Sequence, residues 1–160
     1  MSKNKMTYGK NLTLISLSSL PCDTQVFSTV LNACSGKGIN LDMISQTARK
    51  GGTLNMSFTL SDEDLAAVLG VLGELRSDNI RIKPEVLPGS CKINYYDPDM
   101  VKTPGVAAKM FAALAAADVE VMLVTTSDFD ISILVPAHWL EDALEVLEKE
   151  FGVEGEEVEF

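Results

Sequence analysis

One hydrophobic pattern that occurs twice in the chain constrains its fold more than any other feature. In each half a short apolar segment, at residues 12–17 and again at 91–95, precedes apolar residues that are spaced as on one face of a helix. Alternating apolar residues follow at 39–43 and at 119–123, about 80 residues apart, as in half-buried strands. The repeat predicts two copies of one small fold.

Each half then adds a second strand, a second helix and a last strand. The ranges are residues 54–58, 65–75 and 80–86 in the first half, and residues 131–135, 140–151 and 156–160 in the second. Ser61, followed by three acidic residues, is a typical N-cap for the first of these helices. Pro88 and Gly89 are expected to end the strand at 80–86.

Both halves therefore have the order β-α-β-β-α-β. This order is typical of an α+β, ferredoxin-like module, in which a four-stranded antiparallel sheet carries two helices on one face. We expect a first module at residues 10–88, completed by the terminal strand at 156–160, and a second module at residues 89–155.

Charge and cysteine content argue against several classes of function. With 13 lysines and arginines against 23 acidic residues, the chain has a net charge of -10, which repels nucleic-acid phosphates and anionic lipid. We therefore expect neither a nucleic-acid nor a membrane partner. No apolar stretch resembles a secretory signal or a membrane span, so a cytoplasmic location is expected. The spacing of Cys22, Cys34 and Cys91 fits neither a disulfide framework nor a zinc site, and we expect no metal or cofactor.

Specific sequence matches to one known family lie in both halves. They are residues 38–46 (GINLDMISQ) and 52–59 (GTLNMSFT), and then residues 102–111 (KTPGVAAKMF), 124–128 (VTTSD) and 131–133 (ISI). In this order and at this spacing they resemble the two ACT modules of aspartate kinases. The resemblance covers residues 10–160 and includes no kinase domain, so it implies a regulatory part that is not itself an enzyme.

The same resemblance implies a function and partners. It implies an amino-acid-binding allosteric regulatory protein, similar to the regulatory subunit of aspartate kinase, that senses lysine, threonine or methionine. The expected partners are a free amino acid effector, a second copy in a homodimer, and a separate aspartate kinase catalytic subunit.

A helix that begins after a tight loop offers unpaired N–H groups and a positive dipole end, which suit a carboxylate. The family places its effector between such a helix start and a strand of a facing module. Carried over by position, the first effector-binding set is Asp23, Thr24, Gln25 and Val26 with Asn40, Leu41, Met43, Ile44, Ser45 and Gln46. The second is Thr103, Pro104, Gly105, Val106 and Ala107 with Thr125, Thr126 and Ser127. In the first set the family's Pro-Gly pair falls on Thr24 and Gln25.

Each of these residues also has a purely structural interpretation. Asp23 is equally well explained as an ordinary N-cap. Pro104 and Gly105 can start a helix without any ligand, with proline at the first helical position. The polar residues at 125–127 can bond a local turn.

Two further functions stay open beside the regulator. One is an ACT-type dimerisation or scaffold module whose ligand sites have degenerated. The other is a small enzyme on the same fold, which is disfavoured because no nucleophile-base pair or paired carboxylates occur at a motif spacing.

Overall fold

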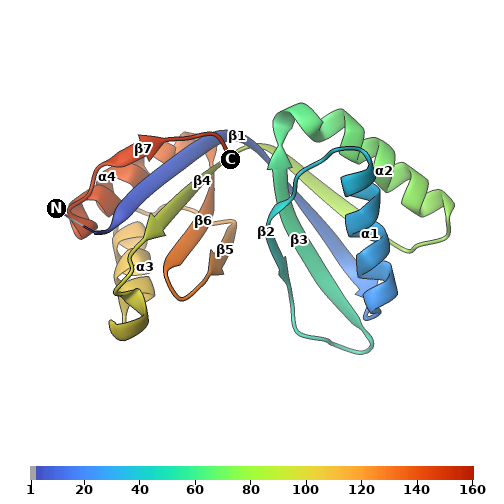
Figure 1. Cartoon of the computed structure of the whole chain (residues 1–160), viewed down its shortest axis with the longest axis horizontal. Coiled ribbons are helices and arrows are strands. Elements are labelled where there is room, and N and C mark those ends of the chain that lie inside the picture. Colours follow the sequence, from blue (N-terminus) through green and yellow to red (C-terminus); the bar gives the residue numbers. More distant parts are fainter. Residues whose placement is uncertain (1–2) are drawn as a thin grey trace. The chain divides into compact units, whose positions relative to one another are not determined.

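The structure, a computed structural model that describes residues 3–160, consists of two units that share two long strands (Figure 1). Strands β1 (Lys5–Pro21) and β4 (Lys83–Tyr96) each contribute a segment to both units. The first unit comprises residues 11–88, and the second comprises residues 3–10 with residues 89–160. Each unit has its own hydrophobic core.

In the 11–88 unit the strand order is β2-β3-β1-β4. Strands β2 (Asp42–Gln46) and β3 (Thr53–Ser61) pair antiparallel, as do β3 and β1. Helices α1 (Thr24–Gly36) and α2 (Leu65–Ser77) contact each other, and a short 3-10 helix η1 (Asp62–Asp64) leads into α2.

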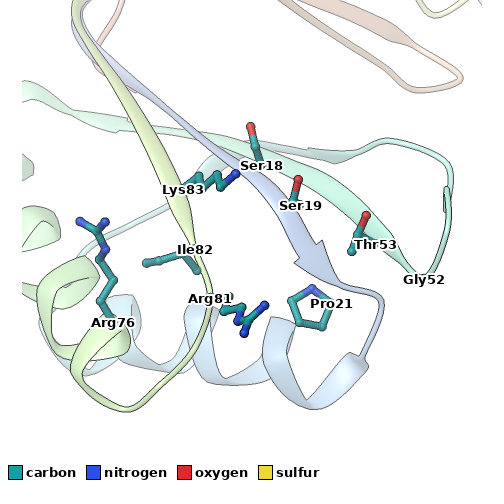
Figure 2. A pocket seen from close by; sticks show the side chains of 9 residues that line it. All are labelled: Ser18, Ser19, Pro21, Gly52, Thr53, Arg76, Arg81, Ile82 and Lys83. Atoms are coloured by element: carbon teal, nitrogen blue, oxygen red, sulfur yellow. The ribbon is translucent and has the colours of Figure 1, made fainter.

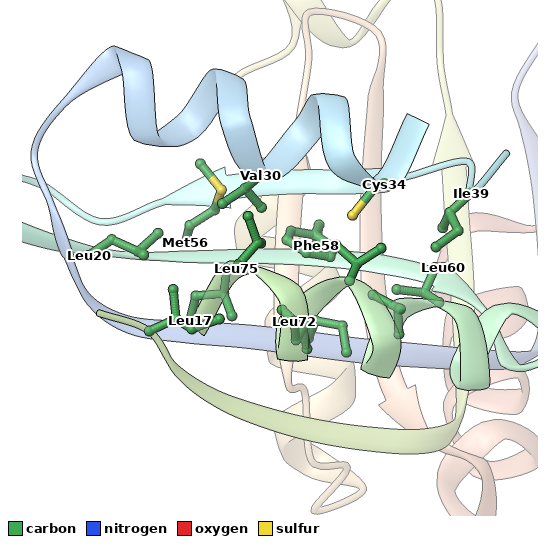
Figure 3. Packing of buried hydrophobic residues seen from close by; sticks show 14 of the residues in the cluster. Leu17, Leu20, Val30, Cys34, Ile39, Met56, Phe58, Leu60, Leu72 and Leu75 are labelled. Atoms are coloured by element: carbon green, nitrogen blue, oxygen red, sulfur yellow. The ribbon is translucent and has the colours of Figure 1, made fainter. Parts of the chain in front are cut away.

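The core of this unit lies between the two helices and one face of the sheet (Figure 3). Leu17 of β1, Val30 and Cys34 of α1, Phe58 of β3 and Leu72 of α2 belong to one buried cluster. The helical spacing of Val30 and Cys34 places both on the same face of α1, which explains why both are buried.

The second unit repeats this plan. Its strand order is β7-β1-β4-β6-β5, in which β4–β6 and β5–β6 are antiparallel and β1–β7 is parallel. Its elements are the 3-10 helices η2 (Met100–Lys102) and η3 (Ala137–Trp139), helices α3 (Val106–Ala116) and α4 (Leu140–Phe151), and strands β5 (Leu123–Thr126), β6 (Asp130–Pro136) and β7 (Gly155–Glu157). The predicted α+β fold with two ACT-like modules is confirmed.

Two β-bulges interrupt the sheet of the 11–88 unit. One extra residue lies in β1 between Leu17 and Leu20, where Ser19 has φ 56° and donates its N–H to Asn55 Oδ1 at 3.0 Å. A second lies in β2, where Met43 has φ 47° and donates its N–H to Asp42 Oδ1 at 2.8 Å. Each bulge changes the direction of the side chains that follow it.

Strand β4 shows that one predicted boundary was wrong. It runs through Pro88 and Gly89, where the sequence predicted the end of a strand and a new one at residue 91. The fixed φ of proline is compatible with strand edges and bulges, so a Pro-Gly pair does not have to end an extended segment. Strands β2 and β5 also begin later than expected, at Asp42 and Leu123.

The terminal strand lies in a different unit from the one we expected. Residues 155–157 pair with residues 6–8 of β1, and the Val158 N–H donates to the Tyr8 carbonyl oxygen at 2.8 Å. This segment therefore belongs with residues 89–160 and does not complete the module at 10–88. The physical reason is that β1 begins at Lys5, with Met6 buried in the second core, and offers its edge there.

Among residues 3–160, no helix is both long enough and apolar enough to cross a membrane.

Candidate functional site

The start of α1 is closed by its own N-cap. The Asp23 carboxylate accepts a hydrogen bond from the Gln25 N–H at 2.8 Å, and the Asp23 carbonyl oxygen accepts from the Phe27 N–H at 3.2 Å. Asp23 has φ −139° and ψ 120°, the extended conformation of an N-cap residue. The N-cap interpretation of Asp23 is therefore confirmed, and one donor at this helix start is already occupied.

The other first-set residues divide between solvent and core. Thr24 and Gln25 are exposed, whereas Val26 packs against the buried cluster of the 11–88 unit. At the start of α1, Thr24 and Gln25 therefore present their side chains to solvent, whereas the Val26 side chain contributes to packing.

The strand residues of the first set, which lie around the bulge in β2, differ in their exposure to solvent. Met43 is only 4% exposed and belongs to the protein interior, whereas Ile44 is 50% exposed. Asn40 and Gln46 are exposed, while Leu41 and Ser45 are half-buried. Met43 is thus a structural residue, and Ile44 is the apolar side chain of this strand that a ligand or second chain can reach.

The start of α3 is built differently. Its N-cap is Gly105, which has φ 98° and no side chain to accept a hydrogen bond from the first turn. Val106 begins the helix and is buried in the second core, while Ala107 is exposed. Positive φ is easily reached only by glycine, so the sequence places glycine where the turn requires it.

The sequence predicted Pro104 at the first helical position, but the structure does not place it there. The left-handed Gly105 separates it from Val106, the first helical residue. A residue with φ 98° cannot continue a right-handed helix, so the helix starts one residue after the Pro-Gly pair.

Polar contacts hold the loop that leads into α3. The Tyr95 hydroxyl donates to Asp97 Oδ2 at 3.4 Å, Asp97 Oδ1 accepts from the Asp99 N–H at 2.9 Å, and the Asp99 carbonyl oxygen accepts from Thr103 Oγ1 at 3.0 Å. Tyr95 is buried and stacks on Phe151, with ring centroids 4.1 Å apart. Burial, followed by the nearby Asp97 carboxylate, raises the pKa of Tyr95, whereas the hydrogen bond from Asn4 lowers it.

The strand residues of the second set lie at the end of β5. Thr125 and Thr126 form the last pairs with β6, opposite Ser132 and Ile131. Ser127 follows the strand, and its Oγ accepts from the backbone N–H groups of Phe129 and Asp130, both at 3.1 Å. The turn interpretation is confirmed for Ser127.

Each predicted set falls within one unit: the first lies in residues 11–88 and the second in residues 89–160. The strands that carry them, β2 and β5, stand at the ends of the strand order. An edge strand presents unpaired backbone groups that a further chain can extend.

The sequence analysis missed two cavities in the 11–88 unit, of about 610 and 600 Å³. They share Ser19 and Thr53, and none of the predicted effector-binding residues lines either one. The larger is shown in Figure 2. One signal could have located them, because the chain has three arginines and all of them, Arg49, Arg76 and Arg81, line these cavities.

Comparisons with known proteins agree with the observed fold. An ACT domain family model matches residues 98–151. An aspartokinase from Geobacillus stearothermophilus is 32% identical over 129 residues, which are 81% of this chain and 31% of the relative. The chain spans about a third of the length of the curated relatives it matches.

Solved structures match over about nine-tenths of the chain. A structure of aspartokinase alpha and beta subunits has 30% identity and a TM-score of 0.83, and the match covers 92% of this chain and 97% of that one. The ligand-free regulatory subunit of aspartate kinase from Thermus thermophilus has 26% identity and the same TM-score, with 91% and 96% covered.

Proposed function

The chain belongs to the family of tandem ACT-domain regulatory regions of aspartate kinase, and on that premise we propose that it binds a free amino acid and so controls an aspartate kinase catalytic subunit. One observation supports this most. The chain has the extent of a regulatory subunit, because it covers 96% of the Thermus thermophilus regulatory subunit. We propose lysine, threonine or methionine as the effector, and no catalytic activity for the chain itself.

The start of α3 is the proposed seat of the effector's carboxylate. Gly105 provides no capping side chain and a Cβ there would meet no atom within 4 Å, so the space beside this helix start is open. The N–H groups of a helix's first turn and its dipole both favour an anion. Thr125 and Thr126 on the edge strand β5 supply hydroxyl groups that can form hydrogen bonds with polar groups of the effector.

The first set plays a second part in the proposal. Asp23 uses one carboxylate oxygen as a cap and is exposed, so its negative charge can hold an ammonium group. A carboxylate ligand is disfavoured at the same helix start, because Asp23 occupies the Gln25 N–H and repels a second anion.

Regulation then follows from linkage. An effector shifts a partner only through its different affinities for two arrangements of the complex. A homodimer formed along the edge strands β2 or β5 would place the effector against a facing module from the second copy. The catalytic subunit would sense which arrangement the effector favours.

The test is a thermal-shift screen with single amino acids, followed by isothermal titration. A ligand that binds only the folded chain raises the melting temperature. We expect lysine, threonine or methionine to do so, Gly105→Leu to abolish the binding, and Gly70→Ala in α2 to leave it unchanged. Absence of any binding in the presence and absence of the catalytic subunit would contradict the proposal.

A second candidate is a dimerisation or scaffold module with degenerate ligand sites. The bond from the Gln25 N–H to Asp23 favours it, since that donor is unavailable to an effector. Sedimentation separates the two: an intact dimer that binds no amino acid, yet still binds the catalytic subunit, supports the scaffold.

A further inference from the structure

The larger of these two cavities, which we call the basic cleft, is lined by cationic, apolar and hydroxyl-bearing side chains (Figure 2). Arg76 at the end of α2, Arg81 in the loop after it and Lys83 at the start of β4 provide the positive charges. Pro21 and Ile82 provide the apolar part, and Ile82 is only 4% exposed. Hydroxyl groups of Ser18, Ser19 and Thr53 complete the lining.

A bulge in β1 lies beside the cleft. Ser19 has φ 56° at the extra residue of the bulge, and its N–H donates to Asn55 Oδ1 at 3.0 Å. The bulge lies near the end of β1, where Pro21 pairs with Thr53 and the turn at Gly52 (φ 81°) leads into β3. The cleft has a volume of about 610 Å³, within the range of small-molecule sites.

Positive charge is concentrated at the two cavities, although the chain as a whole is acidic. Residues 11–88 contain six lysines and arginines, and five of them line the basic cleft or the cavity that adjoins it at Ser19 and Thr53. The sixth, Lys37, pairs with Glu74 at 3.7 Å.

No acidic residue lines either cavity. Within residues 3–160, none of the five cations has a carboxylate oxygen within ion-pair distance. Cations around a cavity attract an anion. Here no carboxylate of the described residues is close enough to be that anion, so an anionic ligand can take its place.

We propose that the basic cleft binds an organic phosphate, a molecule with a multiply charged phosphate group on an apolar or planar body. Arginine binds phosphate through two parallel hydrogen bonds and is preferred over lysine where that geometry matters. Two guanidinium groups and an ammonium group match more than one negative charge, which a neutral amino acid does not carry. Pro21 and Ile82 pack against the organic body. The cleft shares no lining residue with either predicted effector set.

The test uses adenosine diphosphate as the probe, with adenosine and inorganic pyrophosphate as partial ligands. Binding is measured by isothermal titration on the full chain at low and at moderate salt. We expect the diphosphate to bind, adenosine to bind at least about tenfold more weakly, and affinity to fall as salt rises. If pyrophosphate binds as tightly as the nucleotide, Pro21 and Ile82 do not contribute to binding, and the proposal is wrong.

Charge-neutral variants locate the site. We expect Arg81→Gln and Arg76→Gln each to weaken the diphosphate by about tenfold or more, the loss of a charged hydrogen bond. Lys149→Gln removes one positive charge from an exposed position of α4, in the unit that does not contain the cleft, and should leave affinity within about twofold, since an exposed charge outside the cleft is screened. Circular dichroism verifies that each variant is folded.

Two outcomes would overturn the proposal outright. One is no binding of any phosphate by a folded chain. The other is tight binding of an acidic peptide that phosphates do not displace, which would identify the cleft as a contact for a protein segment. Neither outcome contradicts the proposed amino-acid binding, because that binding is assigned to residues that do not line the cleft.

Discussion

The two units follow one order of elements but begin their first helices in opposite ways. Helix α1 starts with Asp23, whose carboxylate bonds the Gln25 N–H at 2.8 Å. Helix α3 starts with Gly105, which has no side chain to accept a bond and stands at φ 98°. The repeat therefore accounts for the shared order of elements, whereas the residue at the N-cap decides whether a side chain bonds the first turn of the helix.

The two units also differ in charge. Residues 11–88 hold six cationic and eight acidic residues, whereas residues 1–10 with 89–160 hold seven and fifteen. An anion with several charges is thus repelled less by the first unit, and there five of the six cations gather at two adjoining cavities. The two units thus share an order of elements but differ in the distribution of charge, which their fold does not determine.

The largest expected effect tests whether the two cores are independent. Phe58→Ala removes a fully buried ring from the cluster of the 11–88 unit and should cost about 3–5 kcal/mol in the free energy of unfolding. Ile133→Ala makes the matching change in the other cluster. Hydrogen exchange should show lost protection mainly in the unit that carries the substitution. Equal loss in both units after either substitution would mean that the cores unfold together.

The next effect concerns the open helix start. Gly105→Ala places a side chain at φ 98°, which should cost about 1–3 kcal/mol although a Cβ meets no atom within 4 Å. Gly70→Ala in α2 also meets no atom, but its backbone is helical, so it should stabilise by about 0.5–1 kcal/mol. Urea denaturation measures both. If Gly105→Ala stabilises the chain, the positive φ at this position does not require glycine, and this difference between the two helix starts is not energetic.

The sequence predicted those parts of the fold that depend on local periodicity. The helical spacing of Val30 and Cys34 and the capping residue Asp23 are local signals, and the structure confirms them. The partner of the terminal strand depends on β1 reaching back to Lys5, a contact between distant residues that no local pattern records. The continuity of β4 through Pro88 and Gly89 was missed because breaker residues interrupt a pattern without always ending a strand.

The candidate site was predictable as a set of positions but not as a set of exposed side chains. Met43 was placed in the effector set because the resemblance carries its position over, yet its side chain is only 4% exposed. The alternation of apolar residues at 39–43 already indicated the buried face of a strand for this residue, and the structure agrees with the alternation. The basic cleft was missed because its lining comes from segments that are far apart in the sequence, at residues 18–21, 52–53 and 76–83, which no local pattern connects.

A smaller effect separates the two roles of Asp23. Asp23→Ala removes the N-cap and should cost about 1 kcal/mol, whereas Asp23→Asn keeps an oxygen that can accept from the Gln25 N–H and should cost less. Both substitutions remove the charge proposed to hold the effector's ammonium group. If amino-acid affinity falls equally in the two variants, the charge is what the effector senses. If affinity is unchanged in Asp23→Asn, Asp23 is a cap only.

The smallest effect is a pH dependence that Cys34 should give to the 11–88 unit. Burial raises the pKa of the Cys34 thiol above its ordinary value of 9.0, while Leu114, at the matching position of α3, does not titrate. Below pH 9 the thiol is neutral in both states and its contribution to stability is complete. As the pH rises from 9.0 through the folded pKa, the thiol ionises first in the unfolded chain, so this contribution is lost.

Cys34→Ala tests this dependence. The variant lacks the thiol, so its free energy of unfolding should fall less than that of the parent chain between pH 8 and about pH 10.5. Leu114→Ala is the matched control, because it shortens a buried side chain at the equivalent position of α3 and keeps the Cys34 thiol. Urea denaturation at several pH values measures all three chains. Parallel curves for the parent chain and Cys34→Ala would show that the thiol does not contribute to the alkaline loss of stability.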